Sequence, residues 1–439
     1  MAPFSYKKHT PLALRNGLQA ALLPTDASTL RGRLCVYAGA LHEQPGEEGL
    51  AHLLEHMLIH GGTRKYSPEE ADRRWESLGE KGASTSRSRT IFEAEMLPED
   101  CEPFLNLLSE MAFSPRFDPR RVREQQAVVL QELADLKSNV AFAHNQAYLQ
   151  ALLGDSPQTS FVGGKEDVLR RATPDALAAF YARTYQASNM ALLFVGALPP
   201  DLPALVERYF EGKPAGRSQR YAFPLITPLP VSTTLHVPAP EFRNKERPSV
   251  SSARLSLGMI VLPHLHADHF AFRVLAKELQ SRLYEQVRQR QGLAYSPQVY
   301  YDGSDNAGVL QVDVGVPSLR QEEAIDAIFG ELSSLQRAPL PPEALDRFTR
   351  QARYSFAQED STPEGQIYRL QTILDHGYTP ERFFEQLHRL TPQCIRELAC
   401  QYLPGGRADP NYVLMIRDPL KAGDPPMALT KPKRERSIR

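Results

Sequence analysis

The chain has 439 residues, a formal net charge of −1 and four cysteines. This length favours two or three domains, and the near-neutral charge argues against a nucleic-acid partner or a membrane surface. No apolar run of about 18 residues occurs, so we expect no membrane-spanning helix. The start lacks an apolar signal core, which favours the cytoplasm. We expect free thiols at Cys35, Cys101, Cys394 and Cys400, because their spacing fits neither a disulfide framework nor a metal site.

The first elements predicted along the chain are a β-hairpin and a single strand. Residues 12–23 predict a hairpin that turns at Asn16-Gly17, a dipeptide favoured in two-residue hairpin loops. A strand follows over about residues 32–38. It leads into a helix that starts near Gly49 and ends near Gly61-Gly62.

Two histidines in this helix are the strongest chemical signal of the chain. In Gly49-Leu50-Ala51-His52-Leu53-Leu54-Glu55-His56 the imidazoles are four residues apart, so they project from one helix face and can bind one metal ion. Glu55 is placed to take a proton from a water held by that metal. Short His/Glu patterns also arise by chance on helix surfaces. The surrounding leucines argue instead for a buried helix, whose polar side chains need partners.

His60 continues the series of histidines at positions 52, 56 and 60. Eight residues rise about 12 Å along a helix, whereas a zinc–nitrogen bond measures only about 2.1 Å. One ion therefore cannot bind both ends of the row, and the third ligand must come from elsewhere in the chain.

The rest of the chain is predicted to repeat one order of strands and helices. In the first half we expect strands at 90–97 and 189–195, and helices at 99–112, 119–150, 174–187 and 201–211. In the second half we expect strands at 252–261, 295–301, 308–315 and 412–416, and helices at 267–290, 318–336, 341–357, 362–376, 379–388 and 391–402. The predicted domains are residues 1–211 and 231–420, with a Pro/Gly/Arg-rich linker at 212–230 and a basic, disordered tail at 421–439.

The order His-x-x-Glu-His is the mirror of the commoner His-Glu-x-x-His and marks inverted zincins. Residues 49–66, with their ending Gly61-Gly62-Thr63-Arg64-Lys65-Tyr66, resemble the pitrilysin/insulinase family of inverted zinc metallopeptidases. The resemblance extends to Ala83–Ser86 with Thr90, to Gly292–Ser296, and over most of the chain. It implies an α+β fold with two similar α/β-roll domains, each an antiparallel-rich sheet covered by helices.

The resemblance also implies the third zinc ligand, a glutamate in a Glu-rich helix roughly 76 residues after the second histidine. Glu132 lies 76 residues after His56. From the residues alone, Glu124, Glu132 and Asp135 all lie on the predicted helix 119–150, and Glu132 is nearer its apolar face than Asp135. We therefore expect one Zn²⁺ per chain, held by His52, His56 and Glu132, with Glu55 as the general base.

Two positions depart from the family pattern. Gln125 stands where the family usually has a second glutamate, seven residues before the ligand, and Gly82 stands where it tends to have asparagine. Glutamine carries no charge, so its support of the metal ligands differs from that of glutamate. We expect both changes to affect turnover rather than the metal site.

Arg288 and Tyr295 are seven residues apart in the second half. Alone, they are typical of a surface arginine and a core tyrosine. The resemblance implies that they face the zinc across a chamber and bond the scissile carbonyl oxygen or the adjacent backbone, which is oxyanion-type stabilisation. Short family members pair two subunits to build the chamber, so the pair would act in trans. A homodimer is the simplest expectation, and a heterodimer with a related subunit is the alternative.

We therefore predict a zinc metalloendopeptidase that cleaves short unfolded peptides. The substrate would lie extended and add a strand to an exposed sheet edge, for which Ala83–Ser86 is the candidate. One alternative is a dedicated precursor or leader-peptide processing peptidase that acts with a partner subunit. The other is a non-catalytic structural subunit, which the Gln125 and Gly82 departures favour and the retained ligands oppose.

Overall fold

The computed structural model describes residues 8–418, apart from 155, 157–158, 160, 219–225, 230–231, 239–251, 265, 295 and 304–306. By internal contacts the chain divides into two units, Met1–Ala222 with Thr349–Arg389, and Phe223–Phe348 with Leu390–Arg439. The boundary at Ala222 lies inside the predicted linker. In addition, 349–389 groups with the first unit, which differs from the single predicted break. The predicted tail lies outside the described residues.

The first unit contains a six-stranded sheet in the order β1-β2-β6-β3-β5-β4. Its strands are β1 Thr10–Ala13, β2 Gln19–Pro24, β3 Leu30–Val36, β4 Glu80–Thr85, β5 Thr90–Met96 and β6 Met190–Gly196. The predicted hairpin is confirmed by the antiparallel pairing of β1 with β2. Strand β4 pairs with β5 and forms one edge of the sheet, as the sequence predicts for Ala83–Ser86.

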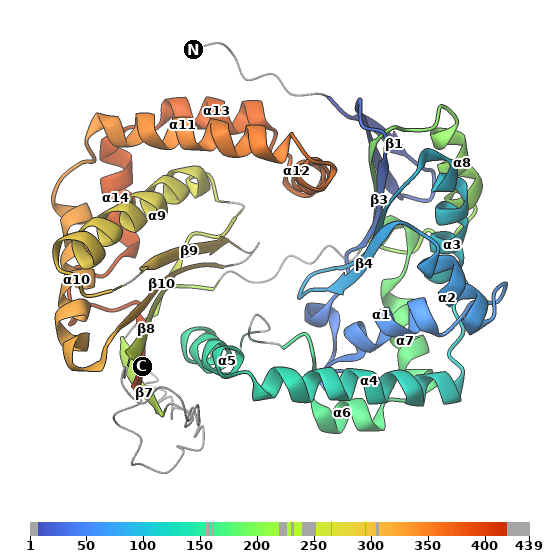
Figure 1. The fold of residues 1–439 in the computed structure, drawn as a ribbon, viewed down its shortest axis with the longest axis horizontal. Helices are drawn as coiled ribbons and strands as arrows, with labels where there is room; N and C mark the ends of the chain where they lie inside the picture. Colours follow the sequence, from blue (N-terminus) through green and yellow to red (C-terminus); the bar gives the residue numbers. More distant parts are fainter. Residues whose placement is uncertain are drawn as a thin grey trace, which may run out of the picture. The chain divides into compact units, whose positions relative to one another are not determined.

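Helices cover one face of this sheet and enclose the main apolar core. They are α1 Leu50–His60, α2 Pro68–Glu76, α3 Cys101–Phe113, α4 Pro119–Ser138, α6 Glu166–Arg171, α7 Pro174–Thr184 and α8 Leu202–Phe210. Helix α5 Val140–Leu153 packs on α4, and none of its described residues is part of this core. Packing is tight enough to require glycine at position 32, since a Cβ there would lie 2.6 Å from a ring carbon of Phe104. Figure 1 shows α3 and α8 on this side of the sheet.

The single long helix predicted over 119–150 is wrong, because α4 and α5 are two helices. Asn139 between them has an extended backbone, with φ −80° and ψ 112°. Its side-chain oxygen accepts a hydrogen bond from the backbone N–H of Phe142. Asparagine thus acts as the N-cap of a new helix, which favours a break over continuation.

The opposite face of the same sheet is covered by α12 Pro363–His376, from far along the chain (Figure 1). Ile367 and Leu370 pack on a buried cluster of side chains from β2, β3 and β6 and the residue after β3, namely Ala21, Leu23, Cys35, Tyr37, Ala191, Leu193 and Val195. Near the end of α12, Asp375 accepts hydrogen bonds from Tyr37 and Arg89. Helix α12 therefore belongs to the first unit although the sequence predicts it in the second domain.

The second unit contains a five-stranded sheet in the order β7-β11-β8-β10-β9. Its strands are β7 Thr233–Pro238, β8 Ser252–Val261, β9 Gln298–Gly303, β10 Gly308–Pro317 and β11 Val413–Asp418. Its helices are α9 His269–Leu283, α10 Gln321–Arg337 and α14 Pro392–Tyr402. Helix α11 Pro342–Glu359 is divided between the two units at residue 349, and α13 Pro380–Arg389 groups with the first unit. The predicted helix 267–290 changes to a π-helix at Tyr284–Arg290. Strand β7, which the sequence analysis missed, pairs in parallel with β11.

The predicted α+β class is confirmed by two sheets with covering helices, one in each unit. The four cysteines are free thiols, as predicted. In the part of the chain that the structure describes, no helix has the length and apolar character needed to cross a membrane.

Candidate metal centre

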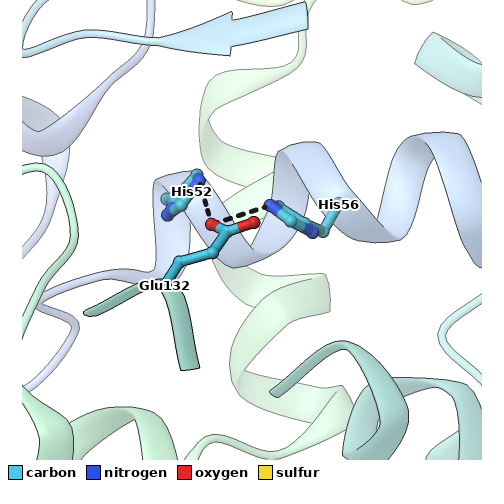
Figure 2. Close-up of side chains that lie close together, drawn as sticks. All are labelled: His52, His56 and Glu132. Atoms are coloured by element: carbon cyan, nitrogen blue, oxygen red, sulfur yellow. Dashed lines mark ion pairs between the residues drawn. The ribbon is translucent and has the colours of Figure 1, made fainter. Parts of the chain in front are cut away.

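The three predicted metal ligands lie together in the first unit, on two packed helices. His52 and His56 project from one face of α1, with ring centroids 4.8 Å apart. Glu132 on α4 points between them, so that its Oε2 atom lies 3.6 Å from Nε2 of each histidine. Figure 2 shows the carboxylate reaching from α4 to both rings.

This geometry fits a zinc ion. Two ligand atoms that each bind zinc at about 2.1 Å, at the tetrahedral angle, lie roughly 3.4 Å apart. The two nitrogen–oxygen distances are close to this value, and the three ligand atoms lie within 4.8 Å of one another. Among the described residues, no other group of three His, Cys, Asp or Glu side chains converges in this way. The Glu132 side chain is 44% exposed, so solvent can reach the site, as a catalytic metal requires.

His60 is not part of this group, as its spacing predicts. Its Nδ1 atom lies 2.8 Å from Oδ1 of Asp72, on α2. The next histidine along the helix therefore has a partner away from the three ligand atoms.

Gln125 orients the ring of His56. The Nδ1 atom of His56 lies 3.3 Å from Oε1 of Gln125. Gln125 is on α4, about two helical turns before Glu132. An amide oxygen only accepts, so Nδ1 donates the hydrogen and Nε2 keeps its lone pair for the metal. Asp118 fixes the start of α4 by accepting hydrogen bonds from the backbone of Arg120 and Arg121.

Both histidines are neutral at neutral pH. Burial, with a smaller contribution from His56, lowers the pKa of His52 to about 4. Burial also lowers the pKa of His56, against opposing effects of Glu132 and Gln125. Neutral imidazoles can bind a metal without first losing a proton.

Glu55 lies beside the histidines on α1 and is buried, with 6% exposure. Its Oε2 atom accepts a hydrogen bond of 2.5 Å from the Thr85 hydroxyl. Burial raises the pKa of Glu55 to about 7, although the Thr85 hydrogen bond acts in the opposite direction. A carboxyl group with a pKa near 7 can both take up and release a proton at neutral pH.

The start of α1 is held by Gly49, where the sequence predicts the helix to begin, and by Glu43, which the sequence analysis did not identify. Gly49 has a left-handed backbone, with φ +104°, which favours glycine. Glu43 accepts a hydrogen bond of 2.9 Å from the backbone N–H of Ala51. Burial raises the pKa of Glu43 to about 8. The contact of Glu43 has no spacing signal in the sequence, because Glu43 lies in the irregular segment before the helix.

The remaining predicted site residues lie elsewhere. Arg288 is in the π-helical segment of the second unit, with its guanidinium 4.9 Å from the ring centroid of Tyr284. Tyr295 lies outside the described residues. Gly82 is on β4, where an added Cβ would meet nothing within 4 Å, so the fold would accept the asparagine that the family tends to have. The roles predicted for Arg288 and Tyr295 stay predictions.

The two-unit α+β fold and the inverted His-x-x-Glu-His site together define an M16-type peptidase architecture. The family model described as insulinase (peptidase family M16) matches residues 21–156, and the one described as the peptidase M16 inactive domain matches 171–351. The chain belongs to peptidase family M16. This confirms the resemblance inferred from its motifs.

Several proteins named as zinc proteases are similar in sequence. The uncharacterized zinc protease YmxG of Bacillus subtilis is 24% identical over 404 residues, 88% of this chain and 94% of the relative. An uncharacterized zinc protease of Rickettsia felis is 25% identical over 285 residues, 64% of this chain and 66% of that one. The chloroplastic stromal processing peptidase of rice is 26% identical over 242 residues, 52% of this chain but only 18% of its own length.

Solved structures share the fold. The periplasmic protease PqqL of Escherichia coli has a TM-score of 0.80 at 20% identity, covering 94% of this chain and 48% of that one. A protease from Helicobacter pylori has a TM-score of 0.78 at 18% identity, covering 94% of this chain and 100% of that one. At these identities the likeness shows the fold alone.

Proposed function

We propose that this protein is a zinc-dependent endopeptidase that hydrolyses short unfolded peptides. The observation that carries the proposal is the convergence of His52, His56 and Glu132, with Oε2 of Glu132 at 3.6 Å from both Nε2 atoms. These three side chains would hold one zinc ion per chain. Zinc bound there would polarise the scissile carbonyl and acidify a water molecule. Relatives named as zinc proteases support the choice of metal.

The chain's own residues would handle the proton. Glu55 takes a proton from the attacking water, holds it, and delivers it to the leaving amine. Its pKa near 7 suits both transfers. Its buried position on α1, next to His56, limits competing contacts with bulk water.

The substrate would bind as an extended strand along β4. This strand is at the edge of its sheet, so its outer backbone groups can pair with a peptide. Binding through main-chain groups gives loose sequence selectivity and requires an unfolded segment. A stable globular protein should therefore resist cleavage.

A chamber between two subunits would complete the site. In a homodimer, Arg288 and Tyr295 of one subunit would stabilise the oxyanion at the zinc site of the other. A heterodimer with a related subunit remains the alternative assembly. A cytoplasmic location is part of the same proposal, and four free thiols fit a reducing compartment.

A second candidate function is processing of one dedicated precursor. The likeness to the rice stromal processing peptidase favours it, since that relative's name describes a processing role. The active-site residues would be the same. Cleavage of a peptide library at one motif would favour processing, whereas cleavage at many sites would favour general peptide degradation.

The first experiment compares zinc content and cleavage of a mixed peptide set for the wild type and Glu55→Gln. We expect about one zinc per chain in both proteins, by elemental analysis, and cleavage only by the wild type. Absence of zinc from both would refute the site, and cleavage by Glu55→Gln would refute the general base. If the protein is instead a non-catalytic structural subunit, the wild-type protein should lack zinc or show no cleavage.

Mixing two inactive variants tests whether the second-half residues act in trans. In a mixed dimer of Glu55→Gln and Tyr295→Phe chains, one site has Glu55 from one chain and Tyr295 from the other. Trans action therefore predicts recovered activity on mixing. Cis action predicts none, because each site would lack one residue.

A further inference from the structure

Two threonine hydroxyls connect the Glu55 carboxylate to the backbone of the first-unit sheet. The Thr85 hydroxyl donates to Oε2 of Glu55 at 2.5 Å. The Thr85 and Thr90 hydroxyl oxygens lie 3.3 Å apart. The Thr90 hydroxyl donates to the carbonyl oxygen of Ala38 at 3.0 Å. This Glu55–Thr85–Thr90 chain joins α1, β4 and β5 to the segment that follows β3.

The strand register fixes the two threonines side by side. Thr85 is the last residue of β4 and Thr90 the first of β5, and they are direct cross-strand partners. Thr90 is buried, and its only hydroxyl proton goes to a backbone oxygen, so its position is set by the fold. Its oxygen then limits where the neighbouring Thr85 hydroxyl can lie. The proton of Thr85 remains for Glu55.

Glu55 depends on this contact for its orientation. Within the described residues, Thr85 provides the one hydrogen bond to the carboxylate, and it goes to Oε2. The Oε1 atom has no such bond there and is left for a substrate water. A carboxylate with one anchor can rotate about its terminal bond once that anchor is lost.

We propose that Thr85 is a positioning residue for peptide hydrolysis, which directs the Oε1 atom of Glu55 toward the attacking water, and that Thr90 holds Thr85 in place. This inference rests on the proposed general-base role of Glu55. Thr85 touches neither the metal ligands nor the proton that moves. Its contribution is therefore to the rate of the chemical step rather than to zinc binding.

Replacement of Thr85 by valine removes the hydroxyl and keeps the shape. Hydrogen bonds to charged groups contribute about 1.5–3 kcal/mol, so kcat should fall roughly tenfold to a hundredfold in Thr85→Val. KM and zinc content should stay at their wild-type values. Thr85→Ser keeps the hydroxyl and should restore most of kcat. Thr90→Val should lower kcat less than Thr85→Val, because it acts through Thr85.

Thr184→Val is the matched control. Thr184 is a buried threonine of the first unit, whereas Thr85 is half-buried, and the Thr184 hydroxyl donates to the Phe180 carbonyl at 2.7 Å, away from Glu55. Thr184→Val should lower the melting temperature about as much as Thr85→Val does, without changing kcat. A crystal structure of Thr85→Val should show the Glu55 carboxylate rotated or in several orientations.

The variants separate this inference from the proposed function. Loss of cleavage in Glu55→Gln with a wild-type kcat in Thr85→Val would refute the positioning role alone. Equal losses in Thr85→Val and Thr184→Val, or no rescue by serine, would also refute it. Cleavage by Glu55→Gln would overturn the general base, and the positioning role with it.

Discussion

Asp375 is a buried link between α12 and the sheet that supports the metal site, and its removal should destabilise the first unit. Its side chain is 6% exposed. It accepts hydrogen bonds from Tyr37 Oη at 2.6 Å, Arg89 Nη1 at 2.7 Å and Gln371 Nε2 at 2.9 Å. The Asp375→Ala substitution removes the acceptor for all three donors and leaves the Arg89 charge without this partner.

The expected cost follows from the burial of the pair. Removing one partner of a buried ion pair costs about 3–5 kcal/mol, because the other charge stays desolvated. The Arg89 side chain is 26% exposed, so water can compensate in part. We therefore expect a loss near the lower end, about 3 kcal/mol, which is a large share of a typical domain stability of about 5–15 kcal/mol.

The single tryptophan of the chain gives a local assay. Trp75 is buried on α2 in the first unit, so its fluorescence during urea unfolding reports on that unit. Asp167→Ala is the control, because Asp167 and its partner Arg171 are 69% and 74% exposed and the pair should contribute below about 1 kcal/mol. A double-mutant cycle with Arg89→Met isolates the pair energy.

Two results would refute this reasoning. One is a loss below about 1 kcal/mol in Asp375→Ala. The other is additivity of Asp375→Ala and Arg89→Met, which would show that the two side chains do not interact in solution. Either result would contradict the contact between α12 and Arg89. It would thereby also contradict the packing of α12 on its face of the first-unit sheet.

Three further predictions concern the metal site. The Gln125→Glu variant should bind zinc about tenfold more tightly in chelator competition, because a carboxylate accepts more strongly from Nδ1 of His56 than an amide does. An unchanged zinc affinity would contradict the orienting contact between residue 125 and His56. Prolonged dialysis against a chelator should abolish cleavage and lower the melting temperature, and zinc should restore both. Metal-free Glu55→Gln should be more stable than metal-free wild type at pH 8, by up to about 3 kcal/mol, but not at pH 4. The sign follows from the pKa of Glu55, raised from 4.5 to about 7: the folded state keeps a proton that the unfolded state releases as pH rises, so wild-type stability falls across this window. Urea midpoints at both pH values measure the difference.

Local signals in the sequence were sufficient for one side of the site. The spacing of His52, Glu55 and His56 places all three on one helix, and a helix fixes their directions. Asp118 and the proline after it mark the start of α4 by ordinary capping rules. Glu132 was different, because a helix carries many carboxylates and only the family spacing selected this one.

Contacts set by long-range packing could not be predicted. Nothing in residues 363–376 indicates which sheet they cover, because an apolar helix face suits any apolar sheet face. The Thr85–Glu55 hydrogen bond depends on the register of β4 against β5 and on how α1 lies across them. The prediction of one helix over residues 119–150 missed the break at Asn139 for a local reason. Asparagine is weakly tolerated inside a helix and strongly favoured as a cap.

Thr85, which hydrogen-bonds Glu55, and Arg89, which hydrogen-bonds Asp375, flank the same turn between β4 and β5. This gives a final prediction. Arg89 ends the turn that follows Thr85, where the Ser86 N–H donates to the Arg89 carbonyl at 2.7 Å. Asp375 holds Arg89 from α12, so Asp375→Ala should loosen the turn and lower kcat in protein that is still folded. If this loss acts through Thr85, adding Asp375→Ala to Thr85→Val should reduce kcat little further. Full additivity of the two losses in kcat would mean that α12 stabilises the unit without positioning its catalytic carboxylate.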